Sequence, residues 1–300
     1  MSDAGHHGAH HVAAVVVNYK SRRHLEGCLA SLAAAGVARV VVVDNGSDDG
    51  SDAVAAAAGA TWCPTGANLG YGRAANRGAD VLGRDGGLHL LICNPDIEVA
   101  PGAVAALVEA LERDPALGVV GPRLHNPDGS LYPSARTFPN LLDAVGHGAL
   151  GLIAPRNRFT RRYRLLDWDH SEPARVDWVS GACFLARRSA WDAVGGFDPA
   201  FFMYMEDVDL CWRLGRAGWA VGYEPAAVVV HTQGVSADLH PYRMLAAHHR
   251  SMWLFARRSS AGPRRLALPV VGVGLVARLA VASARRFAFP AGPRGRRPLA

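Results

Sequence analysis

A chain of 300 residues is long enough to bury a sizeable hydrophobic core, in one large domain or two smaller ones. Half of the residues are hydrophobic, which excludes an intrinsically disordered chain. The net charge of +6 is unevenly distributed, because the body is acidic and the arginine-rich C-terminal part contains no acid after Asp238.

The first 11 residues contain four histidines and no apolar signal-peptide core. We expect residues 1–11 to form a disordered tail and the catalytic part to remain in the cytoplasm. The five cysteines are scattered and include no CxxC pair, which predicts buried thiols in a reducing compartment.

A β-α-β pattern opens the folded part. Residues 12–19 are rich in β-branched side chains and predict a strand, a helical pattern follows Ser21, and residues 40–43 form a second buried strand. Residues 71–82 then predict a helix and residues 88–93 a third strand. Continuous apolar strands separated by helices predict an α/β fold with a mostly parallel, Rossmann-like sheet flanked by helices.

Ligands of such sheets bind beyond the carboxyl ends of the strands, where this sequence is polar. The three strands end in Asn18, in the run from Asp44 to Asp48, and in Asn94-Pro95-Asp96. Turn formation alone could explain the run DNGSDDGS, because Asp, Asn, Gly and Ser favour turns and helix caps.

A glycine-containing loop at residues 68–78 enters the third helix, where backbone N–H groups and arginines could contact phosphate. The sequence has no P-loop, and no GxGxxG follows the first strand. Kinase, ATPase and dinucleotide-oxidoreductase functions are therefore disfavoured.

The middle of the chain is less regular. Residues 102–113 predict a helix, residues 126–129 a turn, and residues 136–175 an irregular region with an arginine cluster. A short strand at residues 227–230 then leads to His231.

The run FFMYMEDVDLCWR, residues 201–213, places Glu206, Asp207 and Asp209 between aromatic residues and a helical segment. Acids in a first helical turn complement the helix dipole, which is one explanation of the run. Mutual repulsion beside apolar side chains should also raise a carboxyl pKa, which suits a general base or a cation site.

In order along the chain, VVVNY, VVVDNGSDDGS, NLGYGRAANRG, LLICNPDIEV, WVSGACFLARRSAWDAVGGFD, FFMYMEDVDLCWR and HTQGVS resemble the inverting, nucleotide-sugar-dependent glycosyltransferases of family 2. The resemblance extends over residues 12–236 and is greatest to the bacterial rhamnosyltransferases. It implies a GT-A glycosyltransferase domain at residues 12–240.

The resemblance also implies a donor site that uses Mg²⁺ or Mn²⁺ as cofactor. Asp96 is the metal candidate, and His231 matches a position that completes the metal site or contacts the diphosphate. Asn94 stands where the family usually has an aspartate. The expected nucleotide-sugar contacts are Asn18, Asp44, Ser47, Arg73, Asn76, Asn94 and Asp96, with Asp44 accepting a hydrogen bond from the ring N–H of the base.

Asp207 corresponds to the family's catalytic base, and Glu206 is its closest rival. We expect Asp209 and Arg213 to form a local pair that orients the loop. The expected acceptor contacts are Trp178, Gly181, Ala182, Phe202 and Tyr204, although Phe202 could equally be a core residue.

Residues 241–300 are expected to form a basic helical extension at the membrane surface. The apolar stretch at residues 266–277 is shorter than the roughly 20 residues that a bilayer span needs, and arginine pairs flank it. This pattern predicts an interfacial helix on an anionic membrane, with no nucleic-acid partner. Arg250, Arg257 and Arg258 are the candidates for binding a diphosphate or lipid head groups.

The resemblance implies transfer of L-rhamnose from dTDP-rhamnose to a polyprenyl-diphosphate-linked saccharide or other glycan. With the basic extension, we expect this transfer at the cytoplasmic face of the cell membrane. Transfer from UDP-galactofuranose, UDP-GlcNAc or UDP-glucose stays open, as does a dimeric state. A nucleotidyltransferase would need a lysine-bearing phosphate loop, and Lys20 is the only lysine. A catalytically silent membrane adaptor is the remaining alternative.

Overall fold

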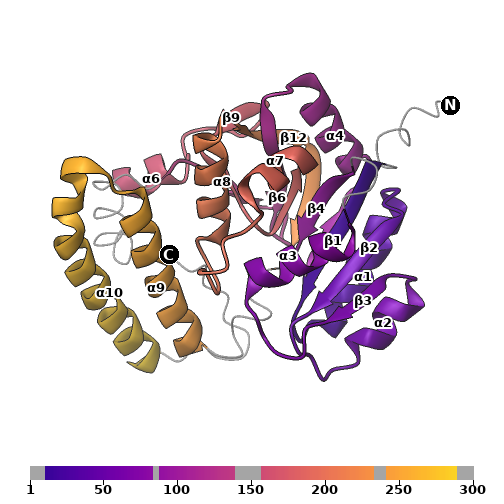
Figure 1. Ribbon diagram of the computed structural model, residues 1–300, viewed down its shortest axis with the longest axis horizontal. Helices are drawn as coiled ribbons and strands as arrows, with labels where there is room; N and C mark the ends of the chain where they lie inside the picture. Colours follow the sequence, from indigo (N-terminus) through magenta and orange to yellow (C-terminus); the bar gives the residue numbers. More distant parts are fainter. Residues whose placement is uncertain (1–10, 84–87, 139–156, 233–240, 289–300) are drawn as a thin grey trace.

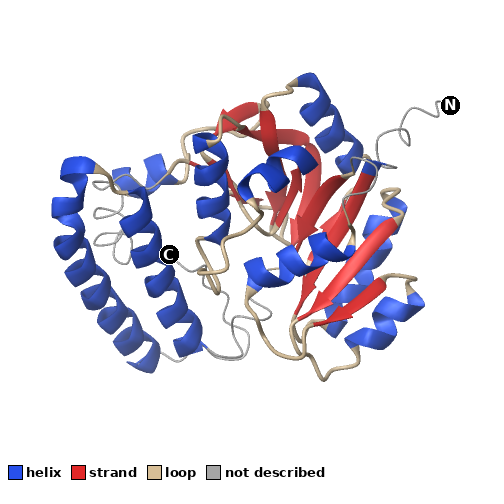
Figure 2. Cartoon of the chain, in the orientation of Figure 1, coloured by secondary structure: helices blue, strands red, loops and turns tan. Residues whose placement is uncertain are grey.

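The computed structural model describes residues 11–83, 88–138, 157–232 and 241–288. A 10-stranded mixed sheet lies between layers of helices (Figure 2). Its strand order is β3-β2-β1-β4-β11-β6-β12-β5, with β7 paired to β6 and β9 paired to β12. The strands of the main order are β1 (Val12–Asn18), β2 (Arg39–Asp44), β3 (Thr61–Pro64), β4 (His89–Cys93), β5 (Ile97–Val99), β6 (Leu117–His125), β11 (Cys183–Ala186) and β12 (Ala220–His231).

The N-terminal half of the sheet is parallel, as the sequence predicts. β1 pairs in parallel with β2 on one side and with β4 on the other. Every residue of β1 is buried, which explains why its sequence is continuously apolar until Asn18. The carboxyl ends of these strands therefore meet at one edge of the sheet.

Helices cover both faces of the sheet and create two cores (Figure 1). On one face, α1 (Arg22–Ala34) and α4 (Ala103–Arg113) pack apolar residues such as Leu25 and Leu107 against the strands. On the other face lie α3 (Tyr71–Val81), α7 (Arg188–Val194) and α8 (Glu206–Arg216), while α2 (Ser51–Ala57) packs beside α1.

Two strands bring the C-terminal half of the chain to the edge where the parallel strands end. β11 is inserted antiparallel between β4 and β6, with Cys183 opposite Cys93. β12 runs parallel to β6 and antiparallel to β5, where His231 pairs with Ile97. The predicted strand at residues 227–230 is thus the last part of a longer one.

The region expected to be irregular contains short elements. These are β8 (Ala135–Arg136), α6 (Arg158–Tyr163) and β9 (Ala174–Val176), with β7 (Leu131–Tyr132) before them and β10 (Trp178–Val179) after them. β8 and β10 pair with each other in a separate two-stranded sheet, which places Arg136 opposite Trp178. Two-residue strands have too little periodicity to be predicted from sequence.

The C-terminal helices α9 (Pro241–Ser259) and α10 (Leu268–Ala288) form a hairpin through the 3-10 helix η5 (Gly262–Ala267) (Figure 1). A Cβ on Gly272 of α10 would lie 3.4 Å from the ring of Trp253 of α9, so the two helices pack closely.

The prediction that the C-terminal apolar segment is too short to cross a bilayer is wrong. The helical segment Gly262–Ala288 has 27 residues and is long and apolar enough to span a membrane by length and composition. The apolar pattern continues beyond Arg278, and one charged residue does not end a helix. None of α10 is buried against the rest of the protein, and Val270, Val273 and Val276 are exposed.

Candidate active site

Asp44 is the centre of a polar network at the ends of β1 and β2. The amide of Asn18 donates to Asp44 Oδ1 at 2.9 Å and to the hydroxyl of Ser47 at 3.2 Å. Asp44 Oδ2 accepts the backbone N–H groups of Gly46 and Ser47 at 3.1 and 2.8 Å. The three predicted nucleoside-pocket residues are therefore together, and Asn18 and Asp44 are buried.

Asn94, Asp96 and His231 meet at the ends of β4 and β12. His231 Nε2 lies 3.2 Å from the Asn94 amide nitrogen and 3.3 Å from Asp96 Oδ1. Both Asp96 and His231 are largely buried, and the Nδ1 atom of His231 has no partner. These three residues, far apart in the sequence, thus form one cluster at the edge of the sheet, as predicted. We call this cluster the Asn94 corner.

The donor set at this corner fits a divalent cation. A carboxylate, an imidazole and an amide are ligand types that such ions accept, and Mg²⁺ usually takes further ligands from phosphate and water. Within the described residues, no group of three or more His, Cys, Asp and Glu side chains is placed to hold a metal ion. Asp96 and His231 would therefore hold such an ion with help from the substrate.

The dipeptide Gly181-Ala182 connects this corner to the acidic helix. The Ala182 carbonyl accepts the backbone N–H of Asn94 at 2.9 Å, and the Gly181 N–H donates to Asp207 Oδ2 at 2.9 Å. The position of Asp207 relative to the ends of the sheet strands is therefore set by one short stretch of backbone.

Glu206 and Asp207 begin α8 but have different surroundings. Glu206 is buried, its Oε2 atom has no partner, and burial together with the Asp207 charge raises its pKa to about 8. Burial also raises the pKa of Asp207, but the N–H groups of Gly181 and Val208 and the charge of Arg136 oppose the rise. At neutral pH Glu206 is thus protonated and Asp207 is the better base.

Arg136 is a further charged residue near Asp207, and no sequence pattern marks it. Its guanidinium lies 4.9 Å from the ring of Trp178 and is flanked by Tyr132 and Tyr163 at 5.7 and 5.9 Å. This aromatic cage holds a positive charge near Asp207. Arg136 lies in a region without regular periodicity, so only its pairing with Trp178 reveals its place.

The glycine-containing loop before α3 contacts the segment that precedes the acidic helix. The Tyr71 N–H donates to the Phe202 carbonyl at 3.0 Å, and a Cβ on Gly70 would lie 2.1 Å from that carbonyl oxygen. The Tyr71 hydroxyl donates to the Gly181 carbonyl at 2.6 Å. Gly70 also has a φ of 86°, so both space and backbone conformation require glycine here.

Arg73 and Asn76 are engaged by the same segment. Arg73 donates to the Pro199 carbonyl at 2.8 Å, and the Asn76 amide exchanges two hydrogen bonds with the backbone of Phe197 at 2.7 and 2.9 Å. These contacts hold the loop before α8. Contact of the two side chains with sugar or phosphate stays a prediction.

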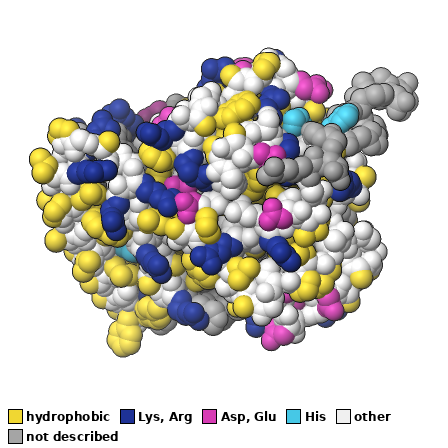
Figure 3. Space-filling model, in the orientation of Figure 1, with side chains coloured by type: hydrophobic (Ala, Val, Ile, Leu, Met, Phe, Trp, Pro, Cys, Tyr) yellow, Lys and Arg dark blue, Asp and Glu magenta, His cyan; other side chains and the backbone are white. Residues whose placement is uncertain are grey.

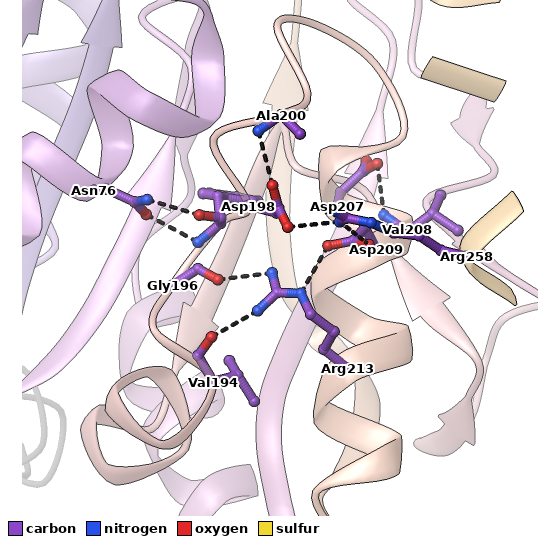
Figure 4. Close-up of polar contacts among 11 residues, drawn as sticks. Asn76, Val194, Gly196, Asp198, Ala200, Asp207, Val208, Asp209, Arg213 and Arg258 are labelled. Atoms are coloured by element: carbon purple, nitrogen blue, oxygen red, sulfur yellow. Dashed lines mark hydrogen bonds and ion pairs between the residues drawn. The ribbon is translucent and has the colours of Figure 1, made fainter. Parts of the chain in front are cut away.

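Asp209 has the structural role that the sequence predicts. It is fully buried, and its Oδ2 accepts the Arg213 guanidinium at 2.7 Å. Arg213 also donates to the carbonyls of Val194 and Gly196, both at 2.7 Å (Figure 4). Arg258 of α9 forms ion pairs with Asp198 at 2.6 Å and Asp209 at 3.1 Å, so it faces the protein interior.

A pocket of about 460 Å³ lies between α9 and the loop that contains Phe202. Tyr19, which follows β1, and Asn68, which precedes α3, line it together with Arg243 and Arg250 of α9. Apolar lining comes from Ala200, Phe202, Met244, Ala246, Ala247 and Leu254. The pocket is therefore largely apolar and carries positive charge.

The predicted acceptor residues are divided between two places. Trp178 and Ala182 are buried near Asp207, and the Trp178 indole donates to the Thr137 carbonyl at 2.9 Å. Phe202 is exposed at the pocket, and Tyr204 packs on the ring of His248 of α9 at 4.8 Å. Arg257 is exposed on α9.

The family model of glycosyl transferase family 2 matches residues 13–195, and that of glycosyl transferase family group 2 matches residues 158–279. The chain belongs to glycosyltransferase family 2 and is an enzyme of the glycosyltransferase class.

Curated relatives agree with the resemblance to bacterial rhamnosyltransferases. The chain is 44% identical to N-acetylglucosaminyl-diphospho-decaprenol L-rhamnosyltransferase of Mycobacterium tuberculosis, over 83% of this chain and 84% of that protein. It is 37% identical to rhamnosyltransferase WbbL of Escherichia coli over 33% of this chain and 34% of that protein.

Solved structures agree with the fold. S. aureus TarS has a TM-score of 0.56 at 13% identity, covering 94% of this chain and 75% of that chain. GalNAc-T7, crystallised with UDP, GalNAc and Mn²⁺, has a TM-score of 0.54 at 14% identity, covering 94% of this chain and 59% of that chain. The predicted GT-A fold is confirmed.

In Glu206→Gln the free energy of unfolding should decrease less at alkaline pH than in the wild type. The pKa of Glu206 in the folded protein is about 8 and its ordinary value is 4.5, so the folded state retains a proton that the unfolded chain loses between these values. The free energy of unfolding of the wild type should therefore fall as pH rises through this window, by roughly a few kcal/mol.

Denaturant unfolding at pH 6 and pH 9 measures this difference. Glu26→Gln, an exposed change on α1, is the matched control and should behave as the wild type does. An equal loss of stability between pH 6 and pH 9 in wild type and Glu206→Gln would show that Glu206 is already ionised in the folded protein at pH 6.

Proposed function

We propose that this enzyme transfers L-rhamnose from dTDP-rhamnose to a polyprenyl-diphosphate-linked saccharide, with inversion at the anomeric carbon. The activity named for the M. tuberculosis relative, 44% identical over most of both chains, supports this choice of sugar and acceptor. The structural observation that carries the proposal is the Gly181-Ala182 bridge, because it sets Asp207 beside the Asn94 corner.

The reaction is a single displacement. The acceptor hydroxyl oxygen attacks the anomeric carbon, the bond from that carbon to the diphosphate oxygen breaks, and Asp207 takes the hydroxyl proton. The N–H of Gly181 orients the Asp207 carboxylate for this role. Glu206, protonated at neutral pH, adds no second negative charge beside the anionic donor.

The donor would lie along the ends of β1, β2 and β4. Asp44, held by Asn18 and Ser47, would accept the ring N–H of the base. Asp96 and His231 would hold a divalent cation, which neutralises the charge on the leaving diphosphate. The Mn²⁺ in the GalNAc-T7 structure supports this cofactor class.

The acceptor would enter from the α9 side. The pocket beside Phe202 combines apolar walls with Arg243 and Arg250, a combination suited to the diphosphate and first isoprene units of a lipid-linked sugar. In the described part of the chain neither arginine has an ion pair with an acid. Trp178, Gly181, Ala182 and Tyr204 complete the proposed acceptor side.

The α9–α10 hairpin would place this pocket at the cytoplasmic face of the membrane. Basic and apolar side chains lie together over α9 and α10 (Figure 3). Exposed valines on α10 offer a surface for lipid tails, and Arg257 and the arginine pairs at both ends of α10 would contact anionic head groups.

Asp207→Asn should lower the rate of rhamnose transfer by about 10²–10⁴-fold, because the amide cannot accept the proton. Glu206→Gln should retain activity within about tenfold at pH 7, because Glu206 is already neutral. Transfer from dTDP-rhamnose to a polyprenyl-diphosphate-linked GlcNAc measures both variants. Loss of activity in Glu206→Gln but not in Asp207→Asn would show that Glu206, and not Asp207, is the base.

Thermal shift with dTDP-, UDP- and GDP-sugars should identify the donor. We expect dTDP-rhamnose to give the largest rise in Tm, and Mg²⁺ or Mn²⁺ to increase it, since a ligand that binds the native state stabilises it by mass action. His231→Ala should remove the metal-dependent increment and retain a smaller nucleotide shift. Selective stabilisation by a UDP- or GDP-sugar would overturn the choice of donor.

Deleting the residues after Arg258 should release the protein from membranes, because the deletion removes η5 and α10. Co-sedimentation with anionic vesicles measures the release, and unchanged partition would refute the proposed membrane role. Arg250→Ala should remain membrane-bound but have a higher KM for the lipid-linked acceptor, which separates the pocket from the anchor.

A further inference from the structure

We infer that Arg258 of α9 is a positioning residue that fixes the segment carrying the catalytic base, so that the C-terminal hairpin is part of the active-site framework. The inference rests on the proposed function, in which Asp207 takes the acceptor proton. It assigns Arg258 a role inside the protein in addition to the charge it adds to α9.

Arg258 contacts both ends of the segment from Asp198 to Asp209, which contains Asp207. Its Nη1 atom lies 2.6 Å from Asp198 Oδ2 and 3.1 Å from Asp209 Oδ1 (Figure 4). Its guanidinium also lies 5.3 Å from the ring centre of Phe201, which is fully buried. Asp198 precedes the loop and Asp209 follows Asp207 by two residues, so one side chain ties the entry and exit of the catalytic segment together.

Asp209 does not need Arg258 for neutralisation alone. Arg213, one turn further along α8, already pairs with Asp209 Oδ2 at 2.7 Å. The second arginine comes from α9, 49 positions away in the sequence, and binds the other oxygen. Two arginines on one buried carboxylate therefore join two helices, whereas a single local pair would stabilise α8 only.

The loop between these points has a backbone that needs external support. Tyr204 and Met205, immediately before Glu206, both have a φ of 66°, a left-handed conformation that non-glycine residues rarely adopt. α9 contacts this stretch twice more, through a hydrogen bond of 2.9 Å from Ser251 to the Met203 carbonyl and through packing of His248 on Tyr204. The helix thus holds the loop at three places.

This arrangement couples the hairpin to catalysis. α9 lines the proposed acceptor pocket and continues into the apolar α10, while its Arg258 holds the start of α8. A change in the position of α9 would therefore move Asp207 relative to Gly181 and the donor. Misplacement of a catalytic group by about 1 Å can reduce a rate by about 100-fold.

The test compares Arg258→Ala, Arg258→Lys and the control Arg216→Ala in full-length protein in detergent micelles. Arg216 is exposed on α8 and contacts the ring of Trp212, so the control removes one positive charge from the same region. We expect Arg258→Ala to lower kcat by about 10–100-fold with the KM for the nucleotide sugar unchanged. Arg258→Lys should recover part of the loss, and Arg216→Ala should match the wild type.

Hydrogen exchange provides a readout that needs no substrate. Backbone amides at residues 201–209 should exchange faster in Arg258→Ala than in Arg216→Ala at a temperature where both are folded. Wild-type kcat in Arg258→Ala, or unchanged exchange in this segment, would overturn the inference. If Arg258→Ala does not fold, Asp198→Asn breaks one end of the same contact and is judged by the same criteria.

The two proposals fail in different ways. A wild-type enzyme that uses another sugar donor overturns the proposed rhamnose transfer, and the variants are then compared with that donor. If the wild type transfers rhamnose, and Arg258→Ala has the same kcat and the same amide exchange at residues 201–209, only the positioning role of Arg258 is overturned.

Discussion

The hydrogen bond from the Gly181 N–H to Asp207 is the contact on which the site depends. It exists because β11 is inserted antiparallel between β4 and β6, which brings the residues just before it to the ends of the parallel strands. The adjacent Ala182 carbonyl binds the Asn94 N–H. A Cβ at Gly181 would lie 3.3 Å from the Asp207 Cβ, so this close approach favours glycine. The backbone of Gly181 and Ala182 therefore joins Asp207 directly to Asn94 at the end of β4.

The two adjacent acids of α8, Glu206 and Asp207, have different surroundings, which favour different protonation states. Glu206 is buried with an oxygen that has no partner, which favours its protonated form. Asp207 receives two backbone N–H groups and lies near Arg136, which favour its ionised form. One negative charge instead of two is an advantage beside a nucleoside diphosphate, since every additional anion in the site opposes binding of the donor. The third acid, Asp209, is fully buried and paired with two arginines.

Sequence patterns predict those structural features that depend on residues close together in the sequence. The parallel strands were identified because β1 and β4 are buried on both faces, and their polar ends mark the site. β12 was seen only in part, since its register with β6 shifts between Glu224 and Val228. The Arg258–Asp209 pair and the cage of Arg136 were missed because their partners come from distant elements and have no periodic signal. The apolar run at residues 266–277 does not reveal the length of α10, because the helix continues through Arg278 to Ala288.

The contact between Gly70 and Phe202 has a mechanical consequence. The Tyr71 N–H binds the Phe202 carbonyl, and no side chain fits at Gly70 between the two backbones. The loop before α3 and the segment before α8 are consequently joined backbone to backbone at this point. Any side chain at position 70 would have to push these two segments apart, so this glycine fixes how closely they can approach.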